Sequence, residues 1–284
     1  MDTIFRSWDL LGQSLAVLKS DKQLMWLPVL SAIFCVAATV TIFGSGLLFV
    51  LPPGPIPQDP AQQKVLWQQM APFLFLFYCV TYSISTYFNV ALVAIASDRM
   101  AGGHASLTDG LQLAWERKWS IIQWALLSGT VGMLLQMLER RLRFLARFVA
   151  SIIGIAWTLA SFFVVPLLAA ENMGPVEALN KSAHIFRKTW GEEVVGGFSF
   201  GLLFSLLAIP GLLLPVFAAR SGLGPAAMLA GAAVMVIYWL LLGVINSAAR
   251  GIFVAALYRY ASDQRVSAGF SRSDLSDAWM HKTE

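Results

Sequence analysis

Charged residues are scarce in this sequence. They make up 13% of its 284 residues, about half of the ~25% that is typical of soluble domains, whereas apolar residues make up 57%. A chain with so little charge cannot present the surface of one or two soluble domains, so the composition favours a membrane protein. The net charge of +4 comes from basic residues in short segments between the apolar runs. We therefore expect no nucleic-acid partner.

Cysteine and histidine are also rare, and each scarcity excludes a class of site. The two cysteines, Cys35 and Cys79, each lie within an apolar stretch, so we predict buried free thiols and no disulfide framework. The three histidines, His104, His184 and His281, lie outside the apolar runs and far apart in the chain. Zinc-protease, paired-cysteine, phosphate-loop and dinucleotide motifs are missing as well. We therefore predict no enzyme, no catalytic residue, no metal and no cofactor.

One stretch nevertheless matches an enzyme pattern. Gly197-Phe198-Ser199-Phe200-Gly201 has the spacing of a nucleophile elbow, which requires a turn between a strand and a helix. The surrounding residues have the pattern of a helix instead, and the histidines lie outside the spans, where they could not activate the serine. We interpret the two glycines as a point where two helices approach closely.

Apolar runs long enough to cross a bilayer recur along the chain. About 20 helical residues at 1.5 Å rise span the ~30 Å hydrocarbon core. We predict an all-α, polytopic membrane protein with about six transmembrane helices, over residues 24–51, 72–97, 120–138, 146–170, 194–219 and 226–246. A single transmembrane domain over residues 1–261 is followed by a polar cytoplasmic tail over residues 262–284. The last apolar run continues to Tyr260, so we expect its helix to project from the membrane or to bend near Arg250.

Three amphipathic segments, near residues 4–18, 106–115 and 175–190, predict cytoplasmic surface helices. The second opens with Ser106-x-x-Asp109, the pattern of a capping box. In the third, one side is apolar and is expected to lie in lipid, through Val176, Leu179, Ala183, Phe186 and Trp190. The layout of surface helix, span, external loop and span recurs from near residues 3, 106 and 174, which suggests an internal threefold repeat.

The distribution of lysine and arginine sets the orientation. The terminal segments and the second and fourth loops are the basic ones, which places both termini in the cytoplasm of a bacterial inner (plasma) membrane. The third loop does not fit, because its four arginines would lie outside. Either the third span is re-entrant and turns back through Gly129 and Gly132, or the arginines lie on an external surface helix and contact lipid phosphates or another anion. We favour lipid phosphate contact by Arg140, Arg141, Arg143 and Arg147.

Polar residues within the spans form a second candidate site. In the six-span topology they lie near one membrane face, where a charge is costly unless it is paired or hydrated. We hypothesise that Glu171 and Arg250 pair, and we favour a helix-packing clasp over a path for a solute or proton. The predicted cluster comprises Tyr82, Ser85, Asn89, Glu171, Asn246 and Arg250.

Short motifs along nearly the whole chain carry a family resemblance. They are Ser7-Trp8-x-Leu10-Leu11-x-x-Ser14, Asp21-Lys22-x-Leu24-x-Trp26-Leu27-Pro28, Asn89-x-Ala91-Leu92, Gly110-Leu111-x-x-Ala114-Trp115, Phe162-Phe163-Val164-Val165-Pro166, Gly174-Pro175-x-Glu177-Ala178-Leu179-x-x-Ser182 and Thr189-Trp190-Gly191. With these motifs the chain resembles a family of uncharacterised bacterial and archaeal multi-pass membrane proteins. The resemblance implies a six-span α-helical membrane fold and no established activity. The four-arginine third loop is more basic than the usual pattern of that family.

A looser similarity concerns the fourth span and the segment after it. A proline-ending span, followed by Glu171, Gly174-Pro175 and a surface helix ending in Trp190, is similar to the membrane domain attached to some glycerophosphodiester phosphodiesterases. The sequence has no catalytic barrel like that enzyme's, so the similarity transfers no activity.

Two functions remain open from the sequence. The first is a non-enzymatic channel or carrier for an ion or small solute, which would need a continuous polar path along Tyr82, Ser85 and Asn89. The alternative is a membrane scaffold or lipid-interacting accessory protein that binds a partner through its surface helices, with lipid at residues 140–147. Membrane lipids and a second copy of the chain, as a homo-oligomer, are the expected partners.

Overall fold

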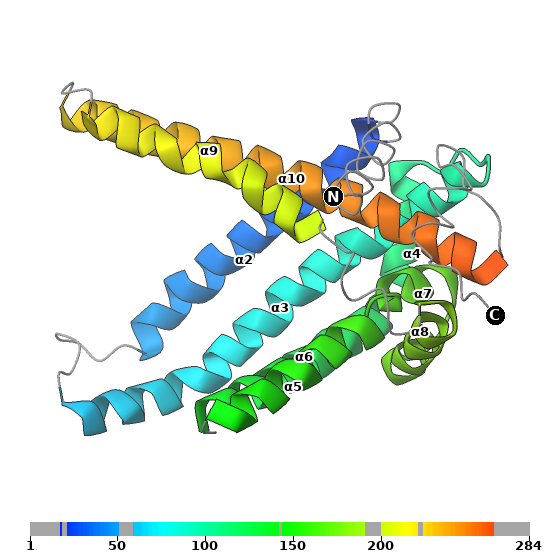
Figure 1. The fold of residues 1–284 in the computed structure, drawn as a ribbon, viewed down its shortest axis with the longest axis horizontal. Coiled ribbons are helices and arrows are strands. Elements are labelled where there is room, and N and C mark those ends of the chain that lie inside the picture. The colour runs from blue at the N-terminus through cyan, green and yellow to red at the C-terminus, as the bar shows by residue number, and fades with distance from the viewer. Residues whose placement is uncertain are drawn as a thin grey trace. The chain divides into compact units, whose positions relative to one another are not determined.

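The computed structural model is helical in almost all of the residues that it describes (Figure 1). These are residue 18 and residues 22–50, 59–141, 144–190, 200–220 and 224–263, and they contain no strand. The all-α fold class is thereby confirmed. The surface helix predicted near residues 4–18 falls, apart from residue 18, outside the described residues. The same holds for residues 264–284 of the predicted polar tail and for Gly197 to Ser199. The chain forms two compact units, which are treated separately: Met1–Pro28, Ile95–Ala105 and Arg187–Glu284 form unit 1, and Val29–Ala94 and Ser106–Phe186 form unit 2.

Within the described part of the chain, five helices are long and apolar enough to cross a membrane. They cover Lys22–Gly44, Ala61–Met100, Lys118–Met137, Ser151–Ala170 and Pro225–Arg259, and a shorter apolar helix covers Phe204–Phe217. These helices indicate a membrane protein. The count of six spans, the single domain and the threefold repeat stay predictions.

In unit 2, α2 (Trp26–Val50) packs along α3 (Pro60–Met100). The ring of Phe43 meets Phe73 and Phe77 edge to face, with centroids 5.6 and 4.7 Å apart. Nearby, the Cys35 thiol donates a hydrogen bond to the Thr81 carbonyl at 3.6 Å. Aromatic packing on this face of α3 therefore holds α2 in place.

Two short polar contacts define where α4 (Leu107–Glu116) begins. Ser106 Oγ accepts from the Asp109 amide at 3.2 Å, and Asp109 Oδ2 accepts from the Ser106 amide at 2.8 Å, which confirms the predicted capping box. The Ser106 amide, which donates to the carboxylate, and the neighbouring Ser106 hydroxyl lower the pKa of the Asp109 carboxyl. Because the folded pKa is lowered, the stabilisation by the cap is present at neutral pH and is lost as the pH falls through that pKa.

Helix α5 (Lys118–Arg141) is uninterrupted through Gly129 and Gly132. The turn that a re-entrant third span would need at those glycines is therefore not present. The next helix, α6 (Phe144–Ala160), begins only three residues after α5 ends, and it already contains Arg147. Arg143 falls outside the described residues, so the external surface helix and its contact with lipid phosphate stay predictions. Helices α5 and α6 lie side by side in Figure 1.

The predicted span over residues 146–170 includes the candidate span Ser151–Ala170, but it contains a turn. Helix α6 ends at Ala160, and α7 (Val164–Ala170) starts after a turn at residues 161–163. Pro166 explains the break, because in one continuous helix its ring would clash with the carbonyl of Phe162. As the third residue of a new helix it is tolerated, since the first amides of any helix lack helical acceptors.

Helix α8 (Pro175–Trp190) has the predicted bounds, and one stripe along it is buried against protein. Ala178, Ser182 and Phe186 are buried, whereas Val176, predicted to lie in lipid, is exposed. The buried residues recur every four positions, so they form one stripe along the helix. The stripe is turned toward protein because Ser182 bonds to the turn between α6 and α7.

In unit 1, α9 (Phe200–Arg220) and α10 (Pro225–Asp263) form an antiparallel hairpin. Helix α10 has 39 residues and is about 60 Å long, as expected for one helix that exceeds a bilayer crossing. Pro210 lies inside α9 without ending it, and the carbonyls of Leu207 and Ala208 beside it accept hydrogen bonds from Tyr238 Oη and Trp239 Nε1, at 2.5 and 3.1 Å. Donors from α10 thus support the helix next to its proline.

The other end of α10 closes the core of unit 1. Residues 252–258 of α10 are buried, as are Leu24 and Leu27 beside the short helix η1 (Lys22–Met25). Arg259 Nη1 donates to the Ser97 carbonyl at 2.6 Å. In the following loop, Asp98 Oδ2 accepts from the Ala105 amide at 2.9 Å. The chain connecting α3 to α4 is therefore fixed by hydrogen bonds as well as by apolar burial.

Candidate functional site

The predicted polar cluster divides between the two units. Three residues of the cluster lie half-buried on α3 in unit 2: Tyr82, Ser85 and Asn89. Glu171, at the end of α7, belongs to the same unit. Asn246, half-buried, and Arg250, exposed, lie on α10 in unit 1. The proposed pairing of Glu171 with Arg250 therefore stays a prediction.

Within unit 2, the Glu171 carboxylate has a different partner. Lys181 Nζ of α8 lies 2.5 and 2.6 Å from the two carboxylate oxygens, in a pair that is about two-fifths exposed. Nearby, the Ser182 hydroxyl accepts a hydrogen bond from the Phe163 amide at 2.9 Å, and this contact is buried. Because an exposed ion pair contributes little, the Ser182–Phe163 bond is the stronger link between α8 and the turn before α7.

The corner between α4 and α5 collects aromatic and basic side chains. Trp115 and Trp119 are 61% and 67% exposed. Lys118 Nζ lies 4.3 Å from the centroid of the Trp115 ring, within the range of a cation–π interaction. Arg117 Nε is buried and has no hydrogen-bond partner in the described part of the chain. We call Trp115, Arg117, Lys118 and Trp119 the corner cluster.

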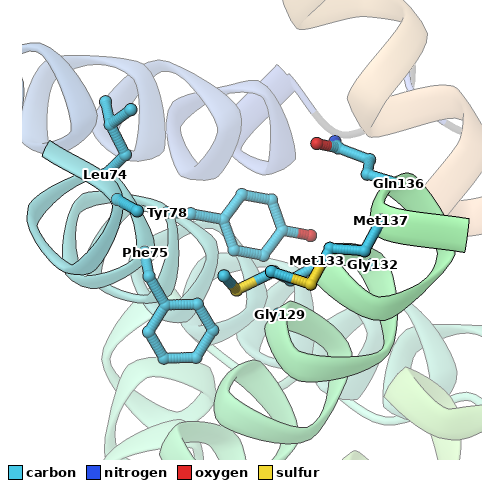
Figure 2. Close-up of a pocket in the computed structure, with 9 residues that line it drawn as sticks. Leu74, Phe75, Tyr78, Gly129, Gly132, Met133, Gln136 and Met137 are labelled. Atoms are coloured by element: carbon cyan, nitrogen blue, oxygen red, sulfur yellow. The ribbon is translucent and has the colours of Figure 1, made fainter. Parts of the chain in front are cut away.

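A groove of about 580 Å³ lies between α3 and α5, within unit 2 (Figure 2). Its lining is mostly apolar and includes two methionines, and the Tyr78 hydroxyl and the Gln136 amide are its polar side-chain groups. In Figure 2 the ring of Tyr78 reaches from α3 into the groove, with its hydroxyl directed toward the residues of α5. The lining residues are Ala71, Leu74, Phe75, Tyr78, Gly129, Gly132, Met133, Gln136 and Met137.

Two glycines of α5 have opposite surroundings at this groove. A Cβ at Gly129 would lie 3.2 Å from atoms of Phe75, Tyr78 and Cys79, so the glycine lets the two helices approach closely. A Cβ at Gly132 would meet no atom within 4 Å. The helices therefore touch at Gly129 and stand apart at Gly132, which opens the groove.

Cys35 and Cys79 are both free thiols, as predicted, and Cys79 is buried, whereas Cys35 is only half-buried. In the described ranges, no three His, Cys, Asp or Glu side chains lie close enough together to hold a metal ion.

Residues 69–270 match a family whose description reads "Family of unknown function (DUF6159)". The chain belongs to the DUF6159 family. No curated protein and no solved structure matches it. The match begins within α3 and includes the groove, the corner cluster and both partners of the Ser182–Phe163 bond. The looser similarity to the membrane domain of glycerophosphodiester phosphodiesterases stays a prediction.

Sequence reasoning missed two features of this DUF6159 chain. The first is the pair of Lys181 with Glu171, although a carboxylate ten residues before the lysine, across a proline turn, was an available signal for a local pair. The groove had a weaker signal, because Gly129 and Gly132 fit a turn as well as a close helix contact. Only the pairing of α3 with α5 distinguishes these interpretations.

Proposed function

We propose that this DUF6159 protein is a non-enzymatic, multi-pass membrane protein that acts by binding membrane lipid. In this proposal it lies in a bacterial inner membrane with both termini and α8 on the cytoplasmic side. The corner cluster is the single observation that carries the proposal. It stands at the start of the candidate span Lys118–Met137, where a span meets the polar region of a bilayer.

The chemistry of the corner cluster matches an anionic lipid surface. Exposed tryptophans are typical of the region between hydrocarbon and head groups. Lys118 and Arg117 add two positive charges beside them. These charges attract a lipid phosphate, while the exposed indole rings insert beside the glycerol backbone.

Removing the two charges of the corner cluster tests this function. Each basic residue at an anionic membrane surface contributes about 1 kcal/mol, so R117Q/K118Q, which removes two of them, is expected to bind phosphatidylglycerol about thirtyfold more weakly. Native mass spectrometry of the detergent-purified protein, titrated with phosphatidylglycerol or phosphatidylcholine, measures the bound lipid. The matched control is K64Q, which removes one charge from an exposed position of α3. Equal phosphatidylglycerol binding by both variants would contradict the proposal.

The channel or carrier role stays a second prediction. Several polar groups of α3 are already engaged, because the hydroxyls of Thr81 and Ser83 donate to the carbonyls of Phe77 and Cys79, at 2.9 and 2.7 Å. Such bonds within one helix favour a dry packing face over a polar path. A flux of ions or small solutes into proteoliposomes that Asn89→Leu abolishes would establish the conduit and overturn our preference.

A further inference from the structure

The groove between α3 and α5 has the features of a binding site for a chain-like apolar ligand. Its volume of about 580 Å³ lies within the usual range of small-molecule pockets. Phe75, Met133 and Met137 supply apolar and adaptable contacts, and methionine in particular adjusts to ligands of irregular shape. Both helices that form the groove are long and apolar enough to cross a membrane. Lipid is therefore the medium that faces the groove.

We propose that this groove holds one acyl chain of a membrane phospholipid. The inference rests on the proposed lipid-binding function and adds the place and the class of ligand. An ion or a polar solute fits poorly, because only the Tyr78 hydroxyl and the Gln136 amide offer side-chain polar contacts along the lining. Those two groups suit the ester carbonyls of a glycerolipid, since a hydroxyl and an amide both donate to a carbonyl oxygen.

The course of α5 favours a lipid that carries a phosphate. The helix continues for one turn beyond Gln136 and ends with Arg140 and Arg141. Residues 136 and 140 are four positions apart, and positions with this spacing share one side of a helix. The sequence therefore has two basic residues after the last polar residue of the lining, in the order in which a phosphate follows the ester groups of a glycerolipid.

Photolabelling tests the inference. The probe is phosphatidylglycerol with a diazirine in one acyl chain, added in small molar excess to the full-length protein in detergent. After irradiation, we expect the label on peptides containing residues 71–78 and 129–137, and we expect unlabelled phosphatidylglycerol to displace it. Diacylglycerol, which lacks the phosphate, should displace it several-fold less effectively. Equal displacement by diacylglycerol would contradict the assignment to a phospholipid.

A matched pair of glycine variants shows whether the label reports the groove. Gly132→Leu places a side chain into the open space, and labelling should fall about tenfold because the space is filled. Gly154→Leu makes the same change on α6, where a Cβ also meets no atom within 4 Å, and labelling should be unchanged. Met133→Trp fills the groove from a second position if the first variant does not fold. Equal labelling of groove-filling and control variants would overturn the inference.

Failure of this inference can be told apart from failure of the proposed function. If groove labelling is absent while R117Q/K118Q still lowers phosphatidylglycerol binding, the acyl-chain site is wrong and the lipid-binding function stands. If the wild-type protein binds no phosphatidylglycerol, both are wrong. A change in oligomer mass in Gly132→Leu, with no labelled groove in the wild type, would assign the groove to a second copy of the chain and overturn the lipid site.

Discussion

Gly211→Val is expected to lower the free energy of unfolding by about 3 kcal/mol, because it forces α9 away from α10. A Cβ at Gly211 would lie 2.6 Å from Trp239 Nε1 and 2.8 Å from an atom of the Tyr238 ring, and the two valine methyls extend further. The two rings would have to move, and their hydrogen bonds to the carbonyls of Leu207 and Ala208 would then be lost. Unfolding by sodium dodecyl sulfate in mixed micelles, followed by circular dichroism, measures the change.

Gly243→Val is the matched control for this variant. Gly243 lies in α10, and a Cβ there would meet no atom within 4 Å. The two substitutions change helix propensity by the same amount, so the difference between their effects reports the contact between the helices. Equal loss of stability in both variants would show that the Tyr238 and Trp239 contacts do not hold the hairpin.

Ser182→Ala is expected to cost about 2 kcal/mol, because the buried Phe163 amide loses its hydroxyl acceptor at no gain in apolar burial. The Ser182 side chain is fully buried and its hydrogen bond to Phe163 is 2.9 Å long. The same unfolding titration measures the loss. Limited proteolysis should also cut more rapidly at the turn over residues 161–163, since this bond ties the turn to α8.

The control for Ser182 is Thr158→Ala. The Thr158 hydroxyl is exposed and donates at 2.9 Å to the Gly154 carbonyl of its own helix. Its removal leaves no buried group without a partner, so we expect a change within about 0.5 kcal/mol. If Ser182→Ala lowers the free energy of unfolding no more than Thr158→Ala does, the Ser182–Phe163 bond does not hold α8 in place.

Local patterns predicted local structure well. The capping box at Ser106 and the bounds of α8 from Pro175 to Trp190 were read from spacing within one turn or a few turns of helix. The break before α7 could also have been predicted, because Pro166 follows an apolar run that was taken as one helix. We gave more weight to the length of the apolar run than to one proline and did not predict the turn, although Ser151–Ala170 is still a candidate span.

Contacts between helices could not be predicted from the sequence. The buried face of α8 could not be deduced, because the partner that selects it is a backbone amide, at Phe163, and amides leave no pattern in a sequence. The groove depends on which side of α5 meets α3, and two glycines three residues apart fit either side. For the same reason the Glu171–Arg250 pair was only a hypothesis, since it joins residues on helices far apart in the chain.

Spin-label accessibility in lipid nanodiscs tests most directly whether the exposed apolar side chains of the long helices lie in lipid. With Cys35 and Cys79 replaced by alanine, single labels are placed at Leu240, Leu134 and Trp119, which are 58%, 60% and 67% exposed. The account predicts that labels at Leu240 and Leu134 collide readily with oxygen and rarely with a water-soluble nickel complex. The label at Trp119 should show the intermediate values of the head-group region. Ready collision of the nickel complex with the Leu240 and Leu134 labels would place those side chains in water and contradict a membrane-embedded, lipid-binding protein.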